Sequence, residues 1–262
     1  MVCGDWHGNV AWARNCLWFA HRKGARAIVQ VGDFGFWAEG WGTEHYLDSI
    51  EKDAREYGIP VYWLDGNHED HSRKAEFNDP ENRPMTTYLP RGFRWDWWGK
   101  RFMAVGGAMS VDKHYRKEGV SWWPEELLTD DEVDYACRDD GIPVDVVFSH
   151  DCPRGVNIPG VGPDTKSGVR GSWPADVLYE AEIHRNKVRK IWESVMPGLW
   201  VHGHYHIPYV SYLARGNDGP HTKFIGLGCD GDRMTATVAF VSFEKGKVVS
   251  EDPLLDVDRL LY

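Results

Sequence analysis

Short apolar runs that end in a polar side chain recur along this 262-residue chain, and they restrict the fold more than any other feature. Examples are AIVQVGD at 27–33, PVYWLDGNH at 60–68, VDVVFSH at 144–150 and GLWVHGH at 198–204. Such brief runs bounded by Gly or Pro are typical of buried β-strands. The chain opens with MVCGDWHGNV, so only four residues precede Asp5. The first strand is therefore a stub, or the sequence begins inside a longer product.

Helical patterns separate these runs. Asn9 is placed to cap a first helix, Thr43 a second, and Thr129 with Glu132 has the spacing of a capping box. The expected helices cover about 10–23, the segment from Thr43 to Gly58, 129–137 and 175–195. Strand-like segments fill the C-terminal part: PYVSYL, KFIGLG, TATVAFVSF and KVVSE, with EKGK as a hairpin turn. This order predicts an α/β fold with a mixed sheet system in one domain, 1–262.

Composition excludes several classes of protein. No run of eighteen apolar residues is present, so no membrane span is expected. The net charge is −10, which disfavours broad binding to the backbone of duplex nucleic acid. The cysteines number five and form no CxxC pair, so we expect a reducing compartment and a cytoplasmic protein.

Side chains able to bind metals stand at the ends of the predicted strands. They are Asp5, His7, Asp33, Asn67, His68, His150, His204 and His206. Each one alone has an ordinary explanation as a turn residue or a core histidine, but those explanations do not predict that all lie at strand ends. In open α/β sheets, sites form outside the carboxyl ends of the strands. Oxygen and imidazole ligands suit Mn, Fe or Zn, and their number suits two ions that share a carboxylate.

The motifs in order resemble those of the calcineurin-like metallophosphoesterases: GDWHG at 4–8, GD at 32–33, GNHE at 66–69, SH at 149–150 and GHYH at 203–206. The resemblance implies a two-sheet sandwich flanked by helices. It also implies that Asp5, His7 and His206 bind one divalent ion and that Asn67, His150 and His204 bind another. Asp33 would bridge the two ions, for which Mn is the first expectation and Fe or Zn the alternatives.

The resemblance also implies the reaction. Metal-bound hydroxide would attack phosphorus, and His68 would protonate the leaving oxygen as general acid. We expect the substrate to be a small phosphodiester such as a nucleotide, with nucleic acid possible but not favoured. Candidate substrate-binding residues are Asn67, His114 and Arg116. The oligomeric state stays open.

Two departures from the family pattern matter. Many members continue the second motif as GDxxD, where the second Asp orients the catalytic histidine, but here Phe36 stands in that place. Asp70 or Asp112 is the candidate replacement. The Arg-Gly of the phosphoprotein phosphatases is missing, which disfavours that branch. A phosphomonoesterase, a phosphoprotein phosphatase and a catalytically inactive metal-binding scaffold of the same fold remain the alternatives.

Some segments receive expectations without a motif. The Gly- and Pro-rich segment 151–173 follows His150 and is expected to border the site as a lid or substrate wall. Cys152 is expected to be a small buried residue. His21, His45, His184 and His221 are expected on solvent-exposed or helix faces. The tryptophans concentrated at 95–98 and 122–123 are expected to pack in the core and at its rim.

Overall fold

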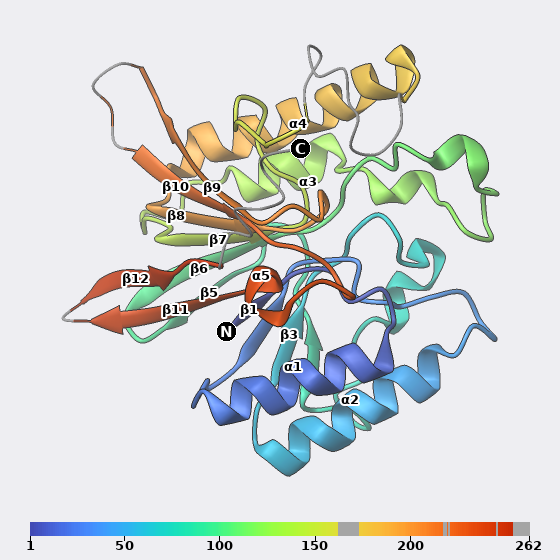
Figure 1. The fold of residues 1–262 in the computed structure, drawn as a ribbon. Coiled ribbons are helices and arrows are strands. Elements are labelled where there is room, and N and C mark those ends of the chain that lie inside the picture. Colours follow the sequence, from blue (N-terminus) through green and yellow to red (C-terminus); the bar gives the residue numbers. More distant parts are fainter. Residues whose placement is uncertain (162–172, 217–218, 220, 245, 254–262) are drawn as a thin grey trace.

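The computed structural model describes residues 1–161, 173–216, 219, 221–244 and 246–253. Two mixed sheets of six strands each lie between pairs of helices (Figure 1). The two-sheet sandwich expected from the sequence is therefore confirmed.

The first sheet has the order β12-β11-β1-β2-β3-β4. Strands β1 to β4 run parallel, whereas β11 pairs antiparallel with β1 and β12 with β11. The strands are β1 (Val2–Cys3), β2 (Ile28–Gln30), β3 (Val61–Trp63), β4 (Thr86–Tyr88), β11 (Val238–Glu244) and β12 (Lys247–Glu251). The first strand is thus a two-residue stub.

The second sheet has the order β5-β6-β7-β8-β10-β9. Strands β6, β7, β8 and β10 run parallel, and the edge strands β5 and β9 are antiparallel to their neighbours. The strands are β5 (Arg94–Trp97), β6 (Lys100–Val105), β7 (Val146–Ser149), β8 (Leu199–His202), β9 (Tyr209–Ala214) and β10 (His221–Gly226).

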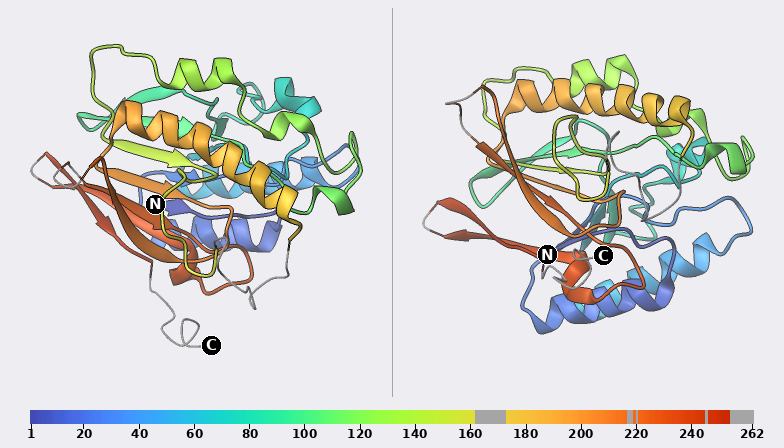
Figure 2. Two further views of the ribbon diagram at one scale, coloured as in Figure 1. Left: turned by 90° about the horizontal axis from the view of Figure 1, so that it is seen from above. Right: turned by 45° about the horizontal axis from the view of Figure 1, so that its top comes forward.

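Helices cover the outer face of each sheet. Helices α1 (Val10–Arg22) and α2 (Thr43–Tyr57) lie side by side on the first sheet, and α3 (Asp130–Ala136) and α4 (Ala175–Val195) lie on the second (Figure 1). Figure 2 shows the long helix α4 crossing above the strands of the second sheet. The short elements are η1 (His71–Glu76), η2 (Lys113–Tyr115), η3 (Pro124–Glu126) and α5 (Met234–Thr237).

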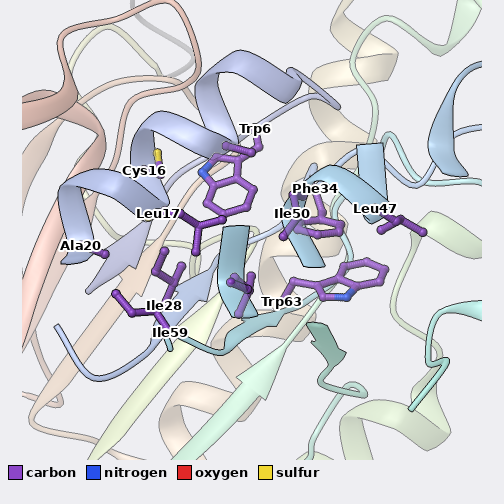
Figure 3. Close-up of a cluster of buried hydrophobic side chains, with 14 of the residues drawn as sticks. Trp6, Cys16, Leu17, Ala20, Ile28, Phe34, Leu47, Ile50, Ile59 and Trp63 are labelled. Carbon is purple, nitrogen blue, oxygen red and sulfur yellow. The ribbon is translucent and has the colours of Figure 1, made fainter. Parts of the chain in front are cut away.

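Three apolar clusters hold these layers together. The first joins α1 and α2 to the first sheet and includes Trp6, Leu17, Ile50 and Trp63 (Figure 3). A second lies between the two sheets, where residues such as Val29 and Phe148 meet. The third joins α3 and α4 to the second sheet. The molecule thus has four layers joined by three apolar clusters, and these clusters fix the position of one sheet relative to the other. The site lies between the two sheets.

Local sequence signals explain most of the helix boundaries. The Asn9 side chain accepts a hydrogen bond from Trp12 N, Gly58 ends α2 in the left-handed region, and Thr129 with Glu132 forms the predicted capping box. The Thr43 prediction is wrong, because Gly42 occupies the N-cap position of α2. The expected strand at TATVAFVSF begins only after the short helix α5.

Within the described part of the chain, no helix has both the length and the apolar character needed to cross a membrane. Much of segment 151–173, the predicted lid, lies outside the described residues, so the structure does not test that prediction.

Candidate metal centre

The loops that follow β1, β2 and β3 of the first sheet and β7 and β8 of the second converge on one site. Asp5 and Asp33 are completely or almost completely buried there, as is His150. Because these strands are parallel within each sheet, their carboxyl ends share one edge. The polar residues that end the predicted strands are therefore neighbours in space.

One group of side chains consists of Asp5, His7, Asp33 and His206. Each offers one ligand atom, and these atoms all lie within 4.8 Å of one another. His206 Nε2 is 2.9 Å from Asp5 Oδ2, and His7 Nε2 is 3.5 Å from Asp33 Oδ2. A divalent ion fits this set of donors, because it would be shared by two carboxylates and two imidazoles.

The second group lies on the other side of Asp33 and contains Asn67, His150 and His204. His150 Nε2 is 3.0 Å from Asn67 Oδ1 and 3.3 Å from Asp33 Oδ1, and its ring centroid is 5.1 Å from that of His204. Asp33 therefore presents Oδ2 to the first group and Oδ1 to the second. This is the arrangement that a bridging carboxylate requires.

The electrostatics of the cluster favour cations. Burial alone would lower the pKa of His7, but hydrogen bonds to Asp230 and Asp33 raise it to about 11. Burial would likewise lower the pKa of His150, yet the nearby Asp33 carboxylate raises it to about 10. The carboxylates of Asp33 and Asp230 thus stabilise positive charge on these two imidazoles.

Burial also fixes the form of His204. It lowers the pKa of the imidazole to about 4, so the ring is neutral at neutral pH.

The backbone is strained at the same positions. Among the described residues, six residues other than glycine have positive φ angles, and four of them are His7, Asp33, His204 and His206. Non-glycine residues in the left-handed region cost about 1–2 kcal/mol each. Such outliers concentrate at functional sites, where the surrounding structure imposes the geometry.

Gly66 allows the β3 loop to approach Asp33. A Cβ at this position would lie 2.1 Å from Asp33 Oδ1 and 2.7 Å from His150 Nε2. The backbone N–H groups of Asn67 and His68 then donate to Asp33 Oδ1 at 2.9 and 3.0 Å. The Asp33 carboxylate is thereby held in one orientation.

Asp230 supports His7, and sequence reasoning missed it. Its Oδ1 lies 2.7 Å from His7 Nδ1, and its Oδ2 accepts a hydrogen bond from Asn9 at 2.8 Å. A carboxylate behind a metal-binding imidazole fixes its orientation and raises its basicity. Asp230 follows β10, so the rule that identified the other strand-end residues also applies to it.

A second missed support holds Asn67. Its Nδ2 donates to Ser110 Oγ at 2.9 Å, and Ser110 donates from Oγ and N to the Glu126 carboxylate at 2.6 and 2.7 Å. These contacts fix the amide so that Oδ1 points to His150. Neither residue belongs to a recognisable motif, and they come from the irregular stretch after β6.

Glu69 fixes two glycine loops. Its carboxylate accepts hydrogen bonds from the backbone N–H groups of Gly35 and Gly66, at 3.0 and 2.5 Å. Burial raises its pKa to about 8, and the nearby Asp33 adds to the shift. The glutamate of the GNHE motif thus ties the loop after β2 to the loop after β3.

His68 lies beside the cluster. Its Nε2 is 3.7 Å from Asp33 Oδ2 and 2.6 Å from Arg116 Nη2, and Arg116 is in turn held by Asp112. Burial lowers the pKa of His68 to about 4, the Asp33 carboxylate opposes this shift, and Arg116 adds to it. Asp112 therefore reaches His68 through Arg116, whereas Asp70 caps η1 by accepting from Ser72 N.

Phe36, which stands where other members have an aspartate, packs in the core. Its ring stacks on Trp63 and lies under the Arg73 guanidinium. It contributes no polar group to His68. Phe36 therefore cannot orient His68 as an aspartate at this position would. The side chain in contact with His68 Nε2 is Arg116.

Asp151 and Tyr205 connect the two histidine-bearing loops of the second sheet. Tyr205 Oη donates to Asp151 Oδ1 at 2.6 Å, and His184 Nδ1 lies 2.8 Å from Asp151 Oδ2. His184 lies on a face of helix α4, which agrees with the expectation of a helix-face residue. Its ring is buried and holds the residue after His150. Cys152 is buried, as expected.

A cavity of about 270 Å³ opens next to His68 and Arg116. Trp123 lines it, whereas Trp95 and Trp97 pack against Phe102 between the sheets. Of the other candidate substrate-binding residues, His114 is exposed and does not line the cavity.

Comparisons with known proteins agree with this geometry. A family model described as calcineurin-like phosphoesterase matches residues 1–208. A lariat debranching enzyme from Arabidopsis thaliana is 27% identical over 134 residues, which cover 47% of this chain and 31% of that protein. The chain thus spans about a third of the length of this curated relative.

Solved structures share the fold at low sequence identity. TT1561 of Thermus thermophilus has a TM-score of 0.55 and 12% identity, with 96% of this chain and 97% of that chain covered. A dimetal phosphatase from Danio rerio has a TM-score of 0.53 and 14% identity, with 94% and 86% covered.

Proposed function

The chain belongs to the calcineurin-like phosphoesterase family, and we propose that it hydrolyses phosphate esters with the help of two divalent ions. The observation that carries the proposal is the orientation of Asp33, whose two carboxylate oxygens face two separate groups of ligands. One ion would be held by Asp5, His7 and His206, and the other by Asn67, His150 and His204, with Asp33 between them. We expect Mn first, and Fe or Zn as alternatives.

When bound, a pair of divalent ions activates a water molecule and neutralises charge on the phosphoryl oxygens. The chain's own residues supply the remaining functions. His68 is the proposed proton donor to the leaving oxygen, because its ring lies outside the ligand groups but close to Asp33. Its Nε2 accepts a hydrogen bond from Arg116 Nη2 in this structure, so the proposed role requires Arg116 to turn from His68 to the bound ester. The negative charge of the ester then favours the protonated imidazole.

Arg116 is the proposed contact for a phosphoryl oxygen. Its Nε and Nη2 lie 2.9 and 2.8 Å from Asp112 Oδ2, and Nη2 is also 2.6 Å from His68 Nε2. Guanidinium groups match the oxygens of a phosphate well. Asn67 is a further proposed contact, because it belongs to the second ligand group and is the chain neighbour of His68.

We propose a phosphodiester, such as a nucleotide or a short single strand, as the substrate. The relative whose name is lariat debranching enzyme supports this class over a phosphoprotein. The net charge of −10 disfavours extended contact with a duplex. The five cysteines all lie among the described residues and none forms a disulfide, which supports the proposal of a reducing compartment such as the cytoplasm.

The test is an assay of the purified, Mn-loaded protein on phosphomonoesters, linear diesters and cyclic nucleotides, with metal content measured in parallel. We expect two ions per chain and the fastest turnover on diesters. Asp33→Asn is expected to leave less than one ion per chain and no turnover, because one oxygen ligand to each ion is weakened. Two ions retained in this variant would contradict the bridging role, and preference for monoesters would contradict the substrate class.

A further inference from the structure

The cavity beside His68 has one polar side and one aromatic side. His68 and Arg116 form the polar side, whereas Trp37, Trp41 and Trp123 contribute indole rings to the other. At about 270 Å³ the cavity is slightly smaller than the usual range for ligand sites, about 300–1,000 Å³. It therefore has room for one ring system rather than for a peptide or a base pair.

Trp37 is fixed in place before any ligand arrives. Its backbone N donates to Thr43 Oγ1 at 2.9 Å, while its carbonyl oxygen accepts hydrogen bonds from Thr43 Oγ1 at 3.1 Å and Arg73 Nη1 at 3.2 Å. The indole meets the His68 ring edge-on, with centroids 6.1 Å apart. A Cβ at Gly8 would lie 2.3 Å from Trp37 Nε1, so the indole packs directly on the backbone after His7. Little conformational entropy remains to be lost when a ring stacks on it.

Trp41 is not explained by core packing. Its side chain is 59% exposed although it lines the cavity, and Val120 on the same lining is 40% exposed. Trp123, by contrast, is only 6% exposed. An indole that is exposed at the wall of a cavity offers a face on which a planar ring can stack.

We propose that this cavity binds a nucleobase of the phosphodiester substrate, stacked on Trp37 and Trp41. The proposal rests on the function proposed above, since Arg116 and the metal centre would hold the phosphate at the polar side. A sugar joins base and phosphate in a nucleotide, so one molecule places an anion beside Arg116 and a flat apolar ring among the indoles. The occupant is thus a single unpaired nucleotide.

The experiment compares binding of adenosine monophosphate and ribose 5-phosphate to the Mn-loaded protein by titration calorimetry. The two probes share sugar and phosphate and differ only in the base. Stacking on an aromatic side chain is worth about 1–3 kcal/mol per base, so we expect the nucleotide to bind on the order of 10- to 100-fold more tightly. Trp37→Ala and Trp41→Ala should remove most of this advantage and leave ribose 5-phosphate binding unchanged. Trp41→Tyr should restore it, because a ring is present again.

Trp18→Ala is the matched control, since Trp18 is similarly exposed, at 52%, but lies on α1 and does not line the cavity. Equal affinity of the wild-type protein for both probes would overturn the proposal, as would an advantage that both alanine variants retain. These readouts do not depend on turnover. If the wild-type protein hydrolyses diesters but binds both probes equally, only the nucleobase site is refuted. If it binds the nucleotide more tightly but hydrolyses no ester, only the proposed activity is refuted.

Discussion

Asp33 is the residue on which most of the proposed site depends. It accepts two backbone hydrogen bonds through Oδ1, faces His7 through Oδ2, and adopts a left-handed backbone conformation. These features could not all be predicted from the sequence. The strand-end rule placed Asp33 in the site, but its orientation depends on Gly66, which comes from another strand.

The role of His68 gives the first prediction at this scale. If His68 donates the proton, His68→Gln should lose about 10²–10⁴-fold in rate on a diester with an alkoxide leaving group. A nitrophenolate hardly needs protonation, so its hydrolysis should slow much less. The measurement is the pair of rates, with bound metal determined in parallel.

The control for this prediction is His114→Gln, which removes an exposed imidazole outside the cavity lining. It should change neither rate. An equal loss on both substrates in His68→Gln, or a drop in bound metal, would exclude the general-acid role.

Residues that act through others were the ones that sequence reasoning missed. Asp230 supports His7 and Glu126 supports Asn67 through Ser110. Ser110 and Glu126 follow no spacing rule, whereas Asp230 follows β10 and could have been found by the strand-end rule. The proposed ligands themselves could be predicted from the sequence, because each follows a strand whose end the sequence marks.

At the scale of elements, local sequence signals predicted the presence of the helices better than they predicted the residues at which the helices begin. The side chain of Thr43 was expected to cap α2, yet it binds the backbone of Trp37 instead. A tertiary contact outweighed the local preference of threonine for an N-cap. The predicted hairpin at EKGK fits the observed pairing of Glu244 with Lys247.

Element η3 carries a buried acid that leads to a prediction on stability. Burial raises the pKa of Glu126 from 4.5 to about 7, although hydrogen bonds from Ser110 oppose the shift. The pKa of Glu126 is higher in the folded state than in the unfolded state. The contribution of this carboxyl group to the free energy of unfolding is therefore complete below pH 4.5 and is lost as pH rises through about 7. The free energy of unfolding should therefore fall over this window by up to about 1.4 kcal/mol per pH unit.

Urea unfolding at several pH values between 4.5 and 7.5 measures this slope. Glu126→Gln should remove the part of the slope that Glu126 contributes, since glutamine does not ionise. Glu125→Gln changes an exposed neighbour and should keep the slope of the wild-type protein. Identical slopes for all three proteins would show that Glu126 does not titrate in this range.

At the scale of the whole molecule, the proposed ligands come from both sheets. Asp5, Asp33 and Asn67 follow strands of the first sheet, and His150 and His204 follow strands of the second. The sequence predicted the α/β class and the strand-rich C-terminal part, and the family resemblance supplied the two sheets. The order of strands within each sheet could not be predicted, because it depends on pairings such as β1 with β11. The extent of the domain, 1–262, remains a prediction.

Ligands from both sheets imply that bound metal stabilises the molecule as a whole. At a free ion concentration of about 100 times Kd, each bound ion adds about 2.7 kcal/mol. For a chain of this size, removal of both ions by a chelator should lower Tm by roughly 10–20 °C. Scanning calorimetry measures the shift, and Asp33→Asn should show a smaller one. A Tm that a chelator leaves unchanged in the wild-type protein would contradict metal binding between the sheets.

The pairing of β1 with β11 has a consequence for how the chain folds during synthesis. Val2 pairs with Ala239 and Cys3 with Val238, so β1 cannot complete its pairing until β11 has been synthesised. Contacts of such long sequence separation slow folding, because the loop must close before the pairing stabilises it. Until then β1 is an open edge of the sheet, and nascent chains are most exposed to aggregation in this period.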